Sequence, residues 1–153
     1  LPENRSRDCR RKKVRGARRM KEIILWRHGQ TDWNIENRFQ GHSDIPLNSV
    51  GRYQAKHAAQ VLRDMEPTRI ISSDLGRAVE TANALASILH VSVIEDQRLR
   101  ETNGGNWEGK TGAQNREEDF ERFTRWIDGE DDPAGGIGER RSEVAARATE
   151  AIF

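Results

Sequence analysis

The sequence predicts an α/β fold with a largely parallel sheet, and two observations support this prediction. Short β-branched and apolar runs lie at residues 21–26, 69–72 and 91–94. Between them lie longer segments in which apolar residues recur at helical spacing. Strands that alternate with helices are typical of parallel sheets, because each helix carries the chain back to the start of the next strand.

Two helices are predicted between these strands. The first has Asn48 or Ser49 as its cap and runs to about residue 65, and the second has Ser73 or Asp74 as its cap and runs to about residue 90. Each has one apolar face, formed by Ala55, Ala58, Ala59 and Leu62 in the first and by Ala78, Ala82, Leu85 and Leu89 in the second.

Beyond residue 94 the alternation weakens. Glycine-rich loops are expected at residues 101–112 and 128–138, with a helix between them and a last helix over residues 139–152. The helix between the loops is marked by Phe120, Phe123 and Ile127. Since the sequence stops inside a helical pattern without a C-cap, we expect these 153 residues to be a fragment of a longer protein, and the alternative is a truncated homologue.

Composition places the chain among ordinary polar globular domains. Hydrophobic residues make up 34% and charged residues 33%. No run approaches the roughly 18 apolar residues of a membrane helix, so no membrane association is expected. The one cysteine, Cys9, excludes a disulfide framework within the chain. We therefore expect a cytoplasmic protein.

Charge is distributed unevenly along the chain. Residues 1–21 contain ten Lys or Arg and two acidic residues, a charge of +8, so the remainder carries −7. We predict a disordered basic tail over residues 1–20 and one domain over residues 21–153. The tail contains no aromatic residue to stack on bases and no recognisable reading motif, so nucleic acid is not the expected partner.

Polar groups suited to phosphate follow two of the predicted strands. Arg27, His28 and Gly29 come directly after the first strand, and Arg77 comes shortly after the second. Because the carboxyl ends of parallel strands meet at one edge of a sheet, these side chains are expected to lie together. The planar fork of arginine binds phosphate oxygens in pairs, and a neutral histidine nitrogen can attack phosphorus.

Six short sequence blocks lie along the chain: LWRHGQTDWN at 25–34, RFQG at 38–41, PLN at 46–48, SSDLGRA at 72–78, RLRE at 98–101 and GNWEG at 105–109. Together they resemble the histidine phosphatase superfamily, also called phosphoglycerate mutase-like proteins. The resemblance covers residues 21–152 in matching order and spacing. An Arg-His-Gly triplet alone is a weak signal, whereas the combination of blocks is specific.

This resemblance implies a three-layer α/β/α fold, phosphoglycerate mutase-like and incomplete at its C-terminus. It also implies a phosphohistidine intermediate and a carboxylic acid that protonates the leaving oxygen. No metal and no organic cofactor are implied. The implied catalytic residues are His28 and Glu101, and the implied substrate-binding residues are Arg27, Asn34, Gln40, Gly41 and Arg77.

One feature of the family is not found in this sequence. The family uses a second histidine, within a His-Gly pair after a late central strand, to donate a hydrogen bond to the phosphate. The other histidines here are His42, His57 and His90, and none is followed by glycine. In the family that late strand lies beside the first strand, so its loss would expose a central edge of the sheet.

Plain structural roles are the alternatives for the site residues. Arg77 could lie on a helix surface and pair with Glu80 or Asp74, and Glu101 could be a solvated loop carboxylate. Two amides could instead make local hydrogen bonds within turns, namely Asn34 and Gln40.

The function that we expect is hydrolysis of a small phosphomonoester. Phosphoglycerate mutase is the alternative within the family, since it uses the same residues. Only 33 residues separate Glu101 from Gly135, and they lack the basic, proline-rich segment expected of such mutases. An alternative of another class is an inactive module that binds a phosphorylated ligand or nucleic acid. The substrate and the oligomeric state are not specified by the sequence.

Overall fold

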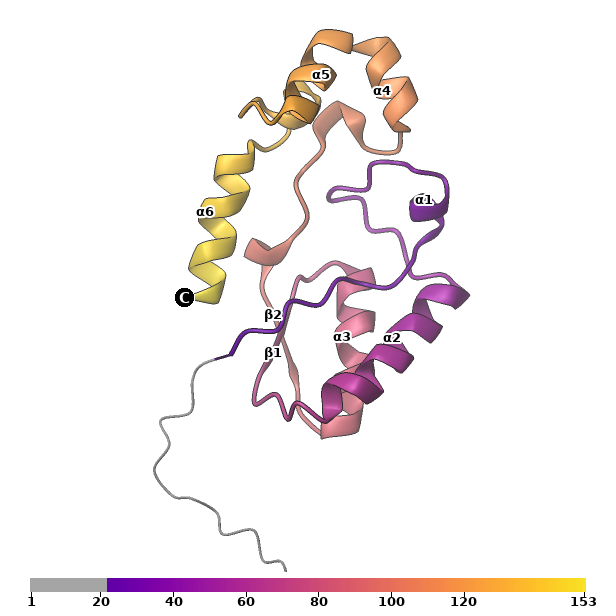
Figure 1. Cartoon of the computed structure of the whole chain (residues 1–153), viewed down its shortest axis with the longest axis vertical. Helices are drawn as coiled ribbons and strands as arrows, with labels where there is room; N and C mark the ends of the chain where they lie inside the picture. The colour runs from indigo at the N-terminus through magenta and orange to yellow at the C-terminus, as the bar shows by residue number, and fades with distance from the viewer. Residues whose placement is uncertain (1–21) are drawn as a thin grey trace, which may run out of the picture.

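The computed structural model describes residues 22–153, so the predicted tail over residues 1–20, together with Cys9, lies outside the described residues. Helices predominate, and Figure 1 shows α2 and α3 beside a small sheet, α4 and α5 at the opposite end, and α6 along one side. The elements in chain order are α1 (Asp32–Ile35), α2 (Ser49–Arg63), β1 (Ile70–Ser72), α3 (Gly76–Leu89), β2 (Val93–Glu95), the 3-10 helices η1 (Gln97–Leu99) and η2 (Gly105–Trp107), α4 (Gly112–Glu118), α5 (Phe120–Asp128), the 3-10 helix η3 (Ala134–Gly136) and α6 (Arg141–Ile152).

The sheet of the described residues consists of β1 and β2, which pair in parallel with Ile71 opposite Ile94. Helix α3 connects the two strands and packs against both, and α2 packs against α3. The core between them contains Ala59, Ile70 and Leu85. This arrangement confirms the α/β class and the parallel pairing, because the chain crosses from β1 to β2 through a helix.

The predicted first strand, residues 21–26, does not form as a strand over its described part, residues 22–26. Residues 22–30 have no regular secondary structure. Ile23 is 54% exposed and Leu25 is 83% exposed. A strand requires a hydrogen-bonded neighbour, and β1 pairs with β2 alone within the described part of the chain. Trp26 still packs against the core that contains Ala59, Ile70 and Leu85, so this segment remains attached to α2, α3 and β1.

The two predicted helices form, but only one has the predicted cap. Asn48 caps α2, because its side-chain oxygen accepts a hydrogen bond from the Gly51 backbone N–H at 2.9 Å. Helix α3 begins at Gly76, and neither Ser73 nor Asp74 caps it. Instead Asp44, from a loop 32 residues earlier, accepts a hydrogen bond from the Gly76 N–H at 2.8 Å. The predicted cap is wrong because the carboxylate of Asp74 is engaged elsewhere.

A second core fills the end of the molecule formed by α4 and α5. Trp107 lies edge-on to Phe123 and to Trp126, with ring centroids 5.3 and 5.5 Å apart. The predicted helix marked by Phe120, Phe123 and Ile127 forms as α5, yet only Phe123 of these three is buried. Its neighbour Trp126 completes the buried face, and Phe120 and Ile127 face solvent.

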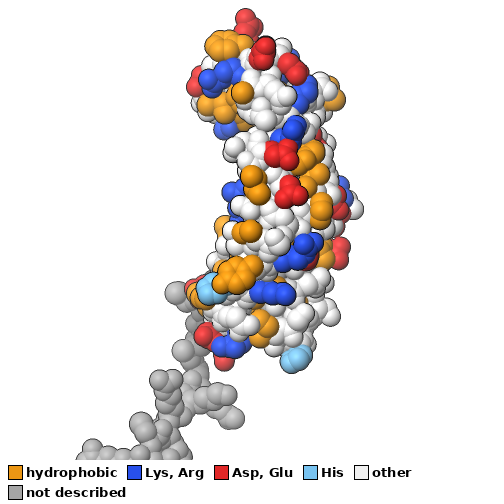
Figure 2. Space-filling view, turned by 90° about the vertical axis from the view of Figure 1, so that its right-hand side faces the viewer, with side chains coloured by type: hydrophobic (Ala, Val, Ile, Leu, Met, Phe, Trp, Pro, Cys, Tyr) orange, Lys and Arg blue, Asp and Glu red, His pale blue; other side chains and the backbone are white. Residues whose placement is uncertain are grey.

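The surface is polar and mixed. Figure 2 shows the side of the molecule that carries α1 and α2, where apolar side chains are interspersed with charged ones. None of the helices between residues 22 and 153 has the length and apolar character that crossing a bilayer requires.

Candidate active site

His28 lies in a turn whose backbone is held against two helices. The Gly29 N–H donates to the Thr81 hydroxyl of α3 at 3.1 Å. A Cβ on Gly29 would lie 2.3 Å from the Gly51 carbonyl oxygen of α2, and one on Gly51 would lie 2.1 Å from the Gln30 carbonyl oxygen. Only glycine allows so close an approach of the two backbones. The histidine is therefore carried by a turn packed directly on α2.

The two ring nitrogens of His28 have different partners. Nδ1 lies 2.7 Å from the Gly29 carbonyl oxygen, which can only accept, so Nδ1 carries the proton. Nε2 lies 3.3 Å from Nε of Arg77, which can only donate, so Nε2 carries the lone pair. This assignment makes Nε2 the nucleophilic atom of a neutral imidazole.

The surroundings of His28 also favour its neutral form. Burial lowers the pKa of His28 from its ordinary value of 6.5, and the charges of Arg77 and Arg27 lower it further. The hydrogen bond with the Gly29 carbonyl and the negative charge of Glu101 act in the opposite direction without outweighing them. At neutral pH the ring is consequently unprotonated and able to attack an electrophile.

Arg77 is almost completely enclosed, with only 1% of its surface exposed. Nη1 donates to the Ser43 carbonyl at 2.8 Å, and Nη2 donates to the Gly41 carbonyl at 2.9 Å. Within residues 22–153 its guanidinium makes no ion pair with a carboxylate. A buried cation without a counterion is costly, so this position suits an anionic ligand.

The helix-surface alternative for Arg77 is wrong. Glu80 pairs with Arg52, and Asp74 pairs with Arg100. Burial lowers the pKa of Arg77, while three carboxylates that lie further away raise it, namely Glu101, Asp44 and Glu108. A guanidinium nevertheless stays protonated at neutral pH, so Arg77 places a fixed positive charge beside Nε2 of His28.

Glu108 organises the loop that holds Arg77, although sequence reasoning assigned it no role. Its carboxylate accepts hydrogen bonds from the backbone N–H groups of His42, Ser43 and Gly104 at 2.8 to 2.9 Å, and from the Ser43 hydroxyl at 2.6 Å. Burial would raise the pKa of Glu108, but these hydrogen bonds outweigh it and lower the pKa. The only signal for Glu108 was its place in the GNWEG block.

Gly41 occupies the tightest point of this loop. Its φ angle is +54°, and a Cβ there would lie 2.0 Å from Oε1 of Glu108. The structure therefore explains Gly41 by the space that Glu108 requires and by the carbonyl that it presents to Arg77.

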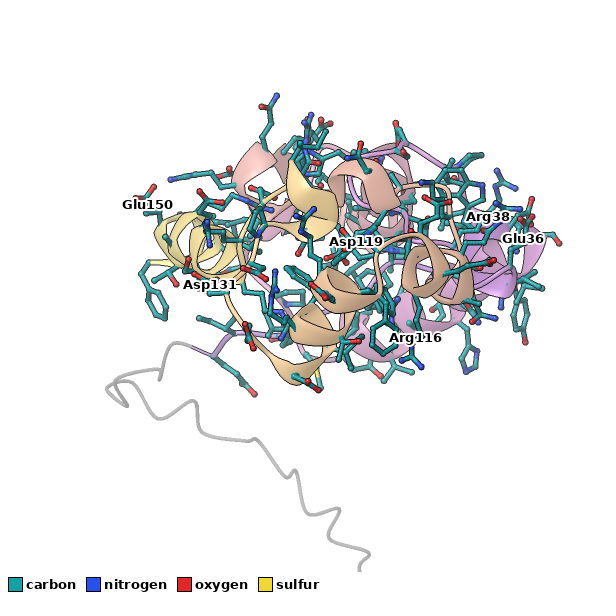
Figure 3. The ribbon with its side chains drawn as sticks, turned by 90° about the horizontal axis from the view of Figure 1, so that it is seen from above. Glu36, Arg38, Arg116, Asp119, Asp131 and Glu150 are labelled. Carbon is teal, nitrogen blue, oxygen red and sulfur yellow. The ribbon has the colours of Figure 1, made fainter. Side chains whose placement is uncertain are left out.

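An open cavity of about 640 Å³ is lined in part by His28, whereas Arg77 does not line it. Arg27, His28 and Asn34 line one part of it, and aromatic residues that include Trp33 and Trp126 line another. Arg38 also borders the cavity, and Figure 3 shows it beside its ion-pair partner Glu36. The cavity lining thus combines the His28 ring and the cationic side chains of Arg27 and Arg38 with an apolar wall.

Asn34 and Gln40 both bond to Thr31, which is fully buried. The Thr31 backbone N–H donates to Oδ1 of Asn34 at 2.9 Å, and the Thr31 hydroxyl donates to Oε1 of Gln40 at 2.9 Å. These are the local hydrogen bonds expected if Asn34 and Gln40 have a structural role. Since Oδ1 of Asn34 is engaged, its amide N–H₂ is the group left for a ligand in the cavity. Phosphate binding by either residue stays a prediction.

Glu101 is exposed, and its carboxylate accepts a hydrogen bond from the Thr102 N–H at 2.8 Å. No hydrogen bond within residues 22–153 joins this carboxylate to His28. Its charge still raises the pKa of both His28 and Arg77, so it lies within electrostatic reach of the pair. The described residues contain no cluster of three or more His, Cys, Asp or Glu side chains that could hold a metal ion.

The chain is similar to known proteins over nearly all of its described length. Residues 23–153 match the family described as the histidine phosphatase superfamily, branch 1. A glucosyl-3-phosphoglycerate phosphatase of Mycobacterium tuberculosis (strain CDC 1551 / Oshkosh) is 43% identical over 131 residues, which is 85% of this chain and 58% of that protein. A probable phosphoglycerate mutase, GpmB, of Proteus mirabilis (strain HI4320) is 40% identical over 134 residues, 87% of this chain and 62% of that protein.

Solved structures show the same similarity. A mycobacterial glucosyl-3-phosphoglycerate phosphatase in complex with VO3 superimposes with a TM-score of 0.74 at 41% identity, covering 82% of this chain and 62% of that one. Bacillus stearothermophilus YhfR gives a TM-score of 0.74 at 39% identity with the same coverage of both chains. The chain thus spans about three fifths of the length of the relatives that it matches.

Proposed function

Because this chain belongs to the histidine phosphatase superfamily, we propose that it hydrolyses a small phosphomonoester through a phosphohistidine formed on His28. The observation that carries the proposal is the contact between Nε2 of His28 and the buried guanidinium of Arg77, at 3.3 Å. It places a neutral nucleophile next to a cation that has no carboxylate partner within the described part of the chain. A dianionic phosphate would satisfy both groups.

The chemistry proceeds in two steps. In the first, Nε2 forms a bond to phosphorus as the ester P–O bond breaks, and Glu101 gives its proton to the departing oxygen. In the second, Glu101 takes a proton from water, whose oxygen attacks phosphorus, and the N–P bond breaks to release inorganic phosphate. Arg77, Arg27 and Asn34 bind the phosphoryl oxygens, on which charge is spread in both transition states.

The proposed reaction requires no metal and no organic cofactor. The cytoplasmic location stays a prediction from composition, as does the expectation that nucleic acid is not a partner. Gln40 and Gly41 belong to the proposal as residues that shape the phosphate pocket, through Thr31 and through the Gly41 carbonyl that Arg77 contacts.

Phosphoryl transfer in a phosphoglycerate mutase is the second candidate, favoured by the name of the Proteus mirabilis relative. A mutase must return the phosphoryl group to its substrate, whereas a phosphatase passes it to water. The two are separated by the products formed from 3-phosphoglycerate. Conversion to 2-phosphoglycerate without phosphate release identifies a mutase, and stoichiometric release of phosphate identifies a phosphatase.

The test of the main proposal is to trap the intermediate. Brief incubation with a ³²P-labelled phosphomonoester should give protein-bound label that is lost in acid and retained in base. His28→Ala should abolish both the label and phosphate release, while His57→Ala, a change at an exposed position of α2, should preserve both. Hydrolysis by His28→Ala at the rate of the parent would refute the mechanism. Phosphate or vanadate binding without any label would instead support the inactive binding module.

A further inference from the structure

Arg147 of α6 is the most extensively bonded side chain near Glu101. Its Nε and Nη2 donate to the two carboxylate oxygens of Glu139 at 2.7 and 2.8 Å. Its Nη1 donates to the backbone carbonyls of Arg98 and Arg100, both at 2.7 Å, and its Nη2 donates to that of Glu101 at 3.0 Å. A guanidinium has five N–H donors, so each has a partner here. Arg147 therefore has no donor left for a phosphate.

Glu139, the partner of Arg147, also binds the backbone that follows Glu101. Its Oε2 accepts a hydrogen bond from the Asn103 N–H at 2.8 Å. The hydrogen bonds from Arg147 lower the pKa of Glu139, and the Asn103 N–H and the charge of Arg147 add to this effect against its partial burial. Glu139 is therefore ionised at neutral pH. The pair holds the backbone both before and after Glu101.

Two further contacts fix the same segment. Nε2 of His42 lies 2.9 Å from the Glu101 carbonyl oxygen, so that oxygen has a second donor. On the other side Arg100 makes a two-pronged ion pair with Asp74, in the loop that leads into α3. The backbone of Glu101 is thus held on both flanks, although its carboxylate is exposed.

We propose that the Glu139–Arg147 pair positions Glu101 for proton transfer to the leaving oxygen, with Arg147 as the positioning residue. This inference rests on the proposed function, because it assigns a purpose to the geometry around the proposed acid. A displacement of about 1 Å of a catalytic group costs on the order of 100-fold in rate. Helix α6, which contacts η1 along one side of the molecule, thereby acts on the site without touching the substrate (Figure 1).

The experiment uses leaving groups of different basicity. An alkyl phosphate needs a proton on its departing oxygen, whereas p-nitrophenyl phosphate releases a stable anion and needs the acid far less. The value of kcat/KM reports the formation of the phosphohistidine for both substrates. In Arg147→Met we expect kcat/KM to fall on the order of 100-fold with the alkyl phosphate and only a few-fold with p-nitrophenyl phosphate. Arg147→Lys should restore part of the loss.

The matched control is Arg141→Met, which removes another guanidinium from α6. That guanidinium lies 4.4 Å from the centre of the Trp126 ring and does not contact the Glu101 segment. The control should leave the ratio of the two kcat/KM values unchanged. In Figure 3 the labels of Asp131 and Glu150 show where α6 lies.

Two results would overturn the inference. One is an equal loss on both substrates in Arg147→Met and Arg147→Lys, which indicates a structural role alone. The other is activity on the alkyl phosphate that matches the parent. If Arg147→Met does not fold, the ratio of the two kcat/KM values in Arg147→Lys decides between a positioning role and a structural role. Failure of the proposed function has a different signature, because the parent then gives no His28-dependent hydrolysis of either substrate, and the positioning role fails with it.

Discussion

Burial gives His28 and Arg77 their chemical character. The sequence predicts that they meet, because both follow predicted strands whose carboxyl ends share one edge. The strand predicted before His28 does not form, however, and the close backbone contact of Gly29 with Gly51 holds the histidine there instead. The role of Glu108 could not be predicted, since it depends on backbone groups of residues 42, 43 and 104 that the fold alone brings together. The same is true of Arg147, whose carbonyl partners lie 46 to 49 residues away. Nearly every residue type offers the same backbone groups, so contacts with backbone atoms leave no signature in the sequence.

The lowered pKa of His28 predicts the acid side of the pH profile. In the proposed mechanism the neutral ring is the nucleophile, so activity should be lost as the pH falls through the pKa of His28 in the folded protein. Because burial and two arginines lower that pKa, the acid limb of kcat/KM should lie below pH 6.5, the ordinary value for histidine. The kinetic profile and the ¹⁵N shifts of the His28 ring during a pH titration should agree. A limb above this value would contradict the assignment of His28.

Replacement of Glu108 tests the loop that holds Arg77. Glu108→Gln keeps the size of the side chain but loses one acceptor oxygen and the charge. Since one or two of the partly buried backbone donors then lack a partner, we expect a loss of about 1–3 kcal/mol in the free energy of unfolding. Urea denaturation measures it. Glu118→Gln, at an exposed position paired with Lys110, should change stability by less than about 0.5 kcal/mol.

At the scale of elements, periodicity predicts helix bodies better than helix ends. The apolar faces of α2 and α3 predicted both helices to within a few residues. The start of α3 was missed because Asp44, its cap, is distant in sequence. The predicted strand at 21–26 failed for a related reason, since a strand depends on a neighbour that local sequence does not reveal.

The Asp44 cap can be tested directly. Asp44→Ala removes the acceptor for the Gly76 N–H and a negative charge at the N-terminus of α3, so we expect a loss of about 1 kcal/mol in the free energy of unfolding. Asp64→Ala, at the exposed end of α2, is the control and should have little effect. Chemical denaturation of the three proteins distinguishes them. Equal stabilities for the parent and Asp44→Ala would show that the cap contributes nothing.

For the whole molecule, carboxylates paired across elements determine the response to acid. The Arg100 side chain lowers the pKa of Asp74, and the Arg147 side chain lowers that of Glu139. Both pairs stabilise the fold above the ordinary carboxyl values of 3.8 and 4.5, and this contribution is lost as the pH falls through the lowered values. We expect Tm to fall below about pH 4.5. Asp74→Asn should flatten that decline, and an unchanged slope would contradict the linkage.

At the scale of the whole molecule, residues 23–25, which precede His28, expose apolar side chains. Ile23, Ile24 and Leu25 are 40–83% exposed, and exposed apolar side chains of this kind can bind hydrophobic dyes. This chain should enhance the fluorescence of anilinonaphthalene sulfonate, and Leu25→Asp should reduce that signal. Ile137→Asp removes an exposed apolar residue from another loop as the control. Equal signals from the two variants would place dye binding elsewhere.

The backbone contact between Gly29 and Gly51 has a consequence for redesign of this protein. On that side the turn and α2 touch through atoms that no substitution can change, because any added Cβ collides with a carbonyl. The cavity lining also contains side chains outside the buried core, among them Trp33 and Ile127. A library meant to change ligand preference should therefore vary these side chains and keep Gly29 and Gly51 as glycine.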